Sequence, residues 1–251
     1  MNDHKYLSTT NLKNSIEEIS KLRFKLLLQN GVVTKIFEES FKGLSIDEEI
    51  KNCSKEDIAT ILDFKNKYKS NLDDQNTEQE INSMCFIRLY SSFEAFMSNL
   101  LIDLYYMFPE SIPDNRKISV ESILLWNNTK SVKEYVIDSV AIDNSYTLEI
   151  WKKTLKTPFG IEFMRAPKNI ERLEFFDLVR NLTLHSDGRV NSKFLTKAPK
   201  SITKKHLKDG VFERVELSVD YYECFNGLQI MLESMIDTIE NKYKFTKKNL
   251  K

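Results

Sequence analysis

Five polar side chains recur at helical spacing in one segment of this 251-residue chain, and their types suit chemistry on an anionic group. On a helix that turns about 100° per residue, their positions relative to Arg180 are about 60° for Asp177, about 100° for Asn181, about 120° for Glu174 and about 140° for His185. An arginine, an amide, a histidine and two carboxylates therefore share one arc.

The residue types on this arc can bind an anion and move a proton. Arg180 presents a planar fork of donors that suits carboxylate or phosphate oxygens. His185 can act as acid or base near neutral pH, and its place in the last helical turn favours the protonated imidazole. The alternative is an ordinary solvated helix face, because Arg followed by His at this range occurs readily by chance. Asn181 directly after the Arg makes a chance match rarer.

Two long helices must position this arc. The first is predicted over residues 168–186, with an apolar arc beside the polar one and a stop at Gly188. The second is predicted from a capping box at Thr77 and Glu80 to Pro109, with apolar residues spaced by three and four. Its members Tyr90 and Phe93 are expected in the core, with base stacking as the alternative.

Glu94 is the one acid in the middle of the second pattern. A carboxylate on an apolar helix needs a partner, and Arg180 is the candidate. Such a pair could belong to a site, or it could be a purely structural salt bridge.

The rest of the chain also predicts helices, which makes the expected fold class all-α. Other predicted helices cover 12–29, 32–50 (after a stop at Asn30-Gly31), a stretch from Ser54, 119–127, 130–141, 147–156 and 219–243, the last capped by Ser218. A short strand is predicted over 211–217. The polar stretch 71–76 suggests two parts, an N-terminal helical segment over 1–75 and a main helical domain over 76–251.

The composition excludes several classes of protein. Six Gly and five Pro are too few for the turns of a β-sandwich, barrel or propeller. Three scattered Cys and three scattered His predict neither a disulfide framework nor a metal site. No Gly-rich phosphate loop, GxSxG or HExxH is present. Without a signal core or an apolar stretch of spanning length, we expect a cytoplasmic protein with no membrane contact.

The balanced net charge of zero conceals a basic C-terminal quarter. Residues 188–251 carry 13 Lys and Arg against eight Asp and Glu. Residues 188–208 contain seven cations and no acid, namely Arg189, Lys193, Lys197, Lys200, Lys204, Lys205 and Lys208. This stretch, which begins beside His185, favours a phosphate-bearing partner, although a solvated connector is an equally good interpretation.

The segment from Phe175 to Val190 resembles the signature helix of the HEPN superfamily, in which an Arg is followed after four to six residues by a His. A polar residue often follows that Arg directly, as Asn181 does here. Tyr90–Phe96, with its central Glu94, is similar to an earlier long helix of many HEPN proteins. Residues 186–243 follow the HEPN order of a polar-Gly turn, a connector with a small strand and a closing helix. The resemblance covers about 78–243, and residues 1–75 have no counterpart.

The resemblance implies a HEPN-like helical bundle that pairs with a second copy and cuts RNA without a metal or another cofactor. It implies catalytic roles for Arg180, Asn181 and His185, with Glu94 and Asp177 in support. The expected RNA contacts are Arg189, Lys193, Lys204, Lys205 and Lys208.

The biological setting implied by the resemblance is a toxin–antitoxin or antiviral defence system. An antitoxin or another regulatory protein would then be a partner. Two alternatives stay open: a non-catalytic HEPN-like module that binds RNA, nucleotide or a protein, and a plain helical interaction protein.

Overall fold

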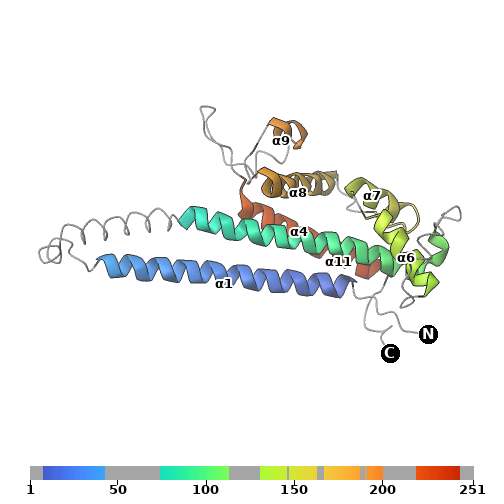
Figure 1. The fold of residues 1–251 in the computed structure, drawn as a ribbon, viewed down its shortest axis with the longest axis horizontal. Helices are drawn as coiled ribbons and strands as arrows, with labels where there is room; N and C mark the ends of the chain where they lie inside the picture. Colours follow the sequence, from blue (N-terminus) through green and yellow to red (C-terminus); the bar gives the residue numbers. More distant parts are fainter. Residues whose placement is uncertain are drawn as a thin grey trace, which may run out of the picture.

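Long apolar stripes and scarce turn residues produce a structure whose described elements are all helices (Figure 1). This computed structural model describes residues 8–42, 74–112, 131–145, 147–162, 167–186, 190, 192–199 and 219–243. The α-helices are α1 (Ser8–Lys42), α4 (Asp74–Met107), α6 (Val132–Asp143), α7 (Leu148–Lys156), α8 (Pro167–Ser186), α9 (Ser192–Lys197) and α11 (Tyr221–Tyr243), and η2 (Pro109–Ser111) is a 3₁₀ helix. The predicted all-α class is confirmed for these residues.

Helix α4 is the centre of the fold, packed by α1, α11, α8 and α6. Figure 1 shows α1 along one side of α4 and α8 on the other. A helix surrounded in this way must be apolar around most of its circumference. Leu89, Phe93, Leu100 and Leu104 are fully buried, as the predicted apolar pattern up to Pro109 requires, although Met84 of the same pattern is exposed.

The predicted break at Asn30-Gly31 is wrong, because α1 runs through both residues as one helix. A glycine in a helix interior costs about 1 kcal/mol relative to alanine, which is too little by itself to end a helix of 35 residues. Leu12, Ile16 and Ile19 are buried in the same core as residues of α4 and α11. The N-terminal helix is thus part of the main hydrophobic core.

Two predicted helix starts are also wrong. Helix α4 begins at Asp74, so Thr77 and Glu80 lie inside the helix and do not form a box at its end. Helix α11 begins at Tyr221, where the Asp220 carboxylate accepts the backbone N–H of Glu223 at 3.2 Å. At α11, Asp220 caps the first turn two residues later than the predicted cap.

The shorter helices α6 and α7 agree with the predicted ranges 130–141 and 147–156 to within two residues, and local caps that were not predicted begin both of them. Ser131 and Glu134 make a reciprocal capping box before α6, and the Thr147 hydroxyl accepts the Ile150 N–H before α7. Helix α9 was not predicted. It interrupts the basic connector, and its buried Phe194 packs on Phe175 of α8.

Four predictions lie outside the described residues: the stretch from Ser54, the helix over 119–127, the strand over 211–217 and the Ser218 cap. Half of the proposed boundary, residues 71–73, lies there too, and residues 74–76 belong to α4. Among the helices that the structure describes, none has the length and apolar character needed to cross a membrane.

Candidate functional site

Helix α8 presents an apolar side to the core and a polar side towards α4 and solvent. Of the predicted apolar arc, Phe175, Val179 and Leu182 are buried and Leu178 is partly buried, and Phe176, which the arc did not include, is buried as well. The ring of Phe176 lies so close to α11 that a Cβ at Gly227 would stand 3.0 Å from its Cζ atom. This tight contact fixes the rotation of α8 and therefore the direction of its polar side.

On that polar side, Arg180 is held by two neighbours. Its Nη1 donates to Oδ1 of Asn181 at 2.9 Å, and its Nη2 lies 3.4 Å from Oε2 of Glu94 on α4. The ion pair predicted between Arg180 and Glu94 is confirmed. Both side chains are partly exposed, at 27% and 36%, so the guanidinium is fixed in direction yet accessible.

Asp177 joins the same group through both of its carboxylate oxygens. Oδ1 accepts the hydroxyl of Tyr90 at 2.9 Å, and Oδ2 accepts Nδ2 of Asn181 at 3.4 Å. Tyr90 is 1% exposed, which confirms its predicted place in the core. We call Tyr90, Glu94, Asp177, Arg180 and Asn181 the polar cluster.

The hydrogen bond that Tyr90 donates to this cluster was not predicted from the sequence. The signal that could have revealed it is spacing, because Tyr90 stands four residues before Glu94 and shares its helix face.

Burial and neighbouring charge shift two titrating groups in the polar cluster. Partial burial raises the pKa of Glu94, an effect that Arg180 opposes and the Asp177 charge reinforces. Burial, followed by the charge of Asp177, raises the pKa of Tyr90 far above its ordinary value. Tyr90 therefore stays protonated and acts only as a donor to Asp177 near neutral pH.

His185 lies beyond the polar cluster, exposed in the last turn of α8. Five residues of helix separate it from Arg180 by about 7.5 Å along the axis. It hydrogen-bonds to no other residue among those the structure describes. The cluster therefore includes Arg180, Asn181, Asp177 and Glu94 of the expected site, with His185 nearby and unattached.

Glu174, which shares the predicted arc, turns to a different partner. Its carboxylate pairs with Lys152 of α7 at 2.8 Å, and Lys152 also pairs with Glu149. The ion pair between Glu174 and Lys152 thus links α8 to α7.

Of the five expected RNA contacts, Lys193 alone falls on described residues, exposed near the start of α9. Arg189, Lys204, Lys205 and Lys208 lie outside them. Within the described part of the chain, no three His, Cys, Asp or Glu side chains gather as a group that could hold a metal ion.

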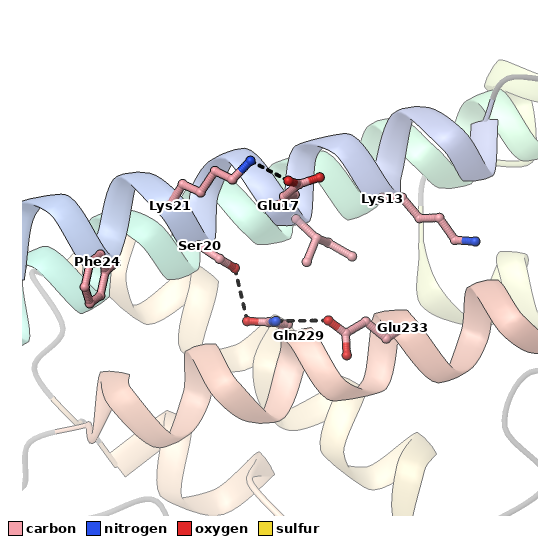
Figure 2. Close-up of a pocket in the computed structure, with 8 residues that line it drawn as sticks. Lys13, Glu17, Ser20, Lys21, Phe24, Gln229 and Glu233 are labelled. Atoms are coloured by element: carbon pink, nitrogen blue, oxygen red, sulfur yellow. Dashed lines mark hydrogen bonds and ion pairs between the residues drawn. The ribbon is translucent and has the colours of Figure 1, made fainter.

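Two surface hollows lie away from the polar cluster. A groove of about 480 Å³ lies between α1 and α11. In it Ser20 donates to Gln229, and the exposed Phe24 is among the lining residues (Figure 2). A wider hollow of about 1120 Å³ lies between the segment after α7, the start of α8 and α11, and Lys156, Arg172 and Ile230 are among its lining residues. Neither hollow is lined by a cluster residue or by His185.

Comparisons of the chain with family models, with curated proteins and with solved structures find no match.

Proposed function

We propose that this protein is a metal-independent endoribonuclease of HEPN type, acting in a toxin–antitoxin or antiviral defence system. One observation carries the proposal. Arg180 and Asn181, which match the HEPN signature, are fixed in direction by Glu94 and Asp177 but stay partly exposed. An arginine that is both oriented and accessible suits recognition of a phosphate group.

The proposed reaction uses the RNA's own 2′-hydroxyl as the nucleophile. The 2′-oxygen forms a bond to the adjacent phosphorus while the bond to the leaving 5′-oxygen breaks, which gives a 2′,3′-cyclic phosphate. His185 removes or supplies the proton that this exchange needs. Arg180 stabilises the charge that builds on the phosphate oxygens, and Asn181 orients Arg180.

The exposed position of His185 supports a reaction shared between two copies of the chain. One imidazole serves as either base or acid at a given moment, while the reaction needs both. A homodimer that brings two α8 helices together would supply two histidines. The toxin or defence setting also implies a partner that restrains the activity, such as an antitoxin.

A second candidate is a non-catalytic HEPN-like module that binds RNA, nucleotide or a partner protein. The observation that favours it is the isolation of His185, since no described residue orients its ring. Arg180 would then serve binding alone.

The deciding experiment incubates the purified protein with total RNA in EDTA, alongside His185→Ala. The proposal expects cleavage that continues in EDTA, leaves cyclic phosphate ends and is lost in His185→Ala. Lys168→Ala is the matched control, because Lys168 is an exposed cation at the other end of the same helix. Activity that requires a metal, or that cuts DNA equally well, would reject the mechanism. RNA binding that depends on His185 without cleavage would favour the second candidate.

A further inference from the structure

Tyr90 brings a hydroxyl from the core to the edge of the proposed site. Its ring packs edge-on against Phe93, with centroids 5.7 Å apart, and lies 6.3 Å from Phe86. All three rings are buried on the central helix α4, so the hydroxyl points in a fixed direction. That direction is towards Oδ1 of Asp177, at 2.9 Å.

The hydrogen bond from Tyr90 occupies one carboxylate oxygen of Asp177 and leaves the other for Asn181. With Oδ1 accepting the hydroxyl, Oδ2 accepts from the amide Nδ2 of Asn181. An ionised carboxylate only accepts hydrogen bonds, so the amide must turn its NH₂ group towards Asp177 and its carbonyl oxygen away. That oxygen then accepts Nη1 of Arg180 at 2.9 Å.

The other side of Arg180 is also held by α4. Glu94, one helical turn after Tyr90, pairs with Nη2 of Arg180. The guanidinium thus lies between Glu94 of α4 and the side-chain oxygen of Asn181. The amide of Asn181 is in turn linked through Asp177 to Tyr90 of α4.

We propose that Tyr90 is a positioning residue for the site, which sets the direction of Arg180 through Asp177 and Asn181. The catalytic consequence rests on the proposed ribonuclease function. The positioning itself is a property of the fold and can be measured without any activity.

The test variant is Tyr90→Phe, which keeps the ring in the core and removes only the hydroxyl. We expect kcat for RNA cleavage to fall about tenfold, a loss of the size that one hydrogen bond to a charged group supports. KM should stay close to the wild-type value, since the phosphate contacts remain. Tyr105→Phe is the matched control, because Tyr105 is equally buried on α4 but its hydroxyl accepts from Asn144, outside the polar cluster.

A double-mutant cycle separates positioning from a general effect on the core. If Tyr90 acts through Asn181, then Tyr90→Phe should change kcat little when Asn181 is already alanine. A purely structural role would give the same loss in both backgrounds, and that additive result would overturn the inference. Asp177→Asn, at a partly exposed position, provides a second variant expected to lower kcat if Tyr90→Phe folds poorly.

The side-chain NH₂ signals of Asn181, observed by NMR, give a readout that needs no RNA. Tyr90→Phe should shift these signals and speed their exchange with solvent, whereas Tyr105→Phe should leave them at their wild-type values. Wild-type protein that does not cleave RNA would reject the proposed function, while a shift in Tyr90→Phe would still support positioning. Unchanged Asn181 signals in Tyr90→Phe would overturn the inference, whether or not the protein cleaves RNA.

Discussion

At the scale of single residues, Arg180 differs from an ordinary surface arginine in how its guanidinium is held. A free surface arginine samples many rotamers, and ordering it on a ligand has an entropic cost. Here Asn181 and Glu94 fix two of its nitrogens before any ligand arrives. Preorganisation of this kind is most useful where charge develops during a reaction.

Substitution of Arg180 tests whether the planar fork or only the positive charge matters. We expect Arg180→Lys to lower kcat/KM for RNA cleavage about 10²-fold and Arg180→Ala to lower it at least as much, because an ammonium is a point charge without the paired donors. Thermal stability should change little, since a partly exposed ion pair contributes about 0–1 kcal/mol. Kinetics and melting curves measure both effects. Near-normal activity of Arg180→Lys would show that charge alone suffices.

Glu94 gives a prediction about stability and pH. Its pKa is raised above the ordinary value of 4.5, mainly by burial, so the folded protein binds this proton more tightly than the unfolded chain does. As the pH rises above 4.5 and Glu94 loses its proton, the free energy of unfolding therefore falls. The quantity to compare is the melting temperature of the wild type minus that of Glu94→Gln. We expect this difference to be larger at acidic pH than at neutral pH.

Melting curves of both proteins across this pH range measure the difference. The two chains share every other titrating group, so their difference isolates Glu94. A difference that grows towards neutral pH would mean that pairing with Arg180 outweighs burial.

At the scale of elements, the predicted bounds agree with the short helices α6 and α7 to within two residues and disagree with the two longest, α1 and α4. Helices α6 and α7 begin one or two residues after the predicted starts at 130 and 147, and nearby residues cap both first turns. The stop at Asn30-Gly31 and the box at Thr77 are contradicted by α1 and α4. Long helices gain stability from packing along many turns, and that gain exceeds the influence of one local signal.

Gly31 offers a direct test of this explanation. The Cβ of an alanine there would have nothing within 4 Å apart from its chain neighbours and its own helix. We therefore expect Gly31→Ala to stabilise the protein by about 0.5–1 kcal/mol, because alanine loses less backbone freedom in a helix. Gly227→Ala is the contrast, since its Cβ would meet the buried ring of Phe176 at 3.0 Å.

Chemical denaturation of the two variants measures the effect. Gly31→Ala should raise the unfolding midpoint, and Gly227→Ala should raise it less or lower it. Destabilisation by Gly31→Ala would show that this part of α1 needs the freedom of glycine.

At the scale of the whole molecule, polar contacts as well as the core join α1 to the rest of the chain. The Asp103 carboxylate of α4 accepts the backbone N–H of Ser8, the first residue of α1. Further along α1, Arg23 donates to Asn82 of α4 and Asn226 of α11. Its guanidinium also lies 4.6 Å from the ring centroid of Phe225. The three long helices thus form one frame, and α8 rests on two of them.

The proposed chemistry predicts a homodimer in which the two α8 helices face each other. Light scattering should show a dimer at micromolar concentration, and cleavage activity per chain should fall on dilution as the dimer dissociates, since each monomer has one exposed His185. The physical reason is that base and acid are needed together. A stable monomer whose activity does not depend on concentration would contradict this arrangement.

Residue types and spacing were sufficient to predict the helical class, the apolar sides of α4 and α8, and the pairing of Glu94 with Arg180. These features follow from residue spacing along one helix, or from the need of a carboxylate on an apolar helix for a partner. It also placed Asp177, Arg180 and Asn181 on one arc, because helical geometry fixes the angles between neighbours.

Which members of that arc contact one another depends on how the helices pack. Glu174 points to Lys152 of α7 and leaves the group, whereas Tyr90 enters it from the core of α4. Both choices depend on where neighbouring helices lie, and no spacing within α8 contains that information. The place of α1 in the core is likewise a tertiary feature, since Leu12, Ile16 and Ile19 are buried with residues of α4 that lie more than forty positions further along the chain.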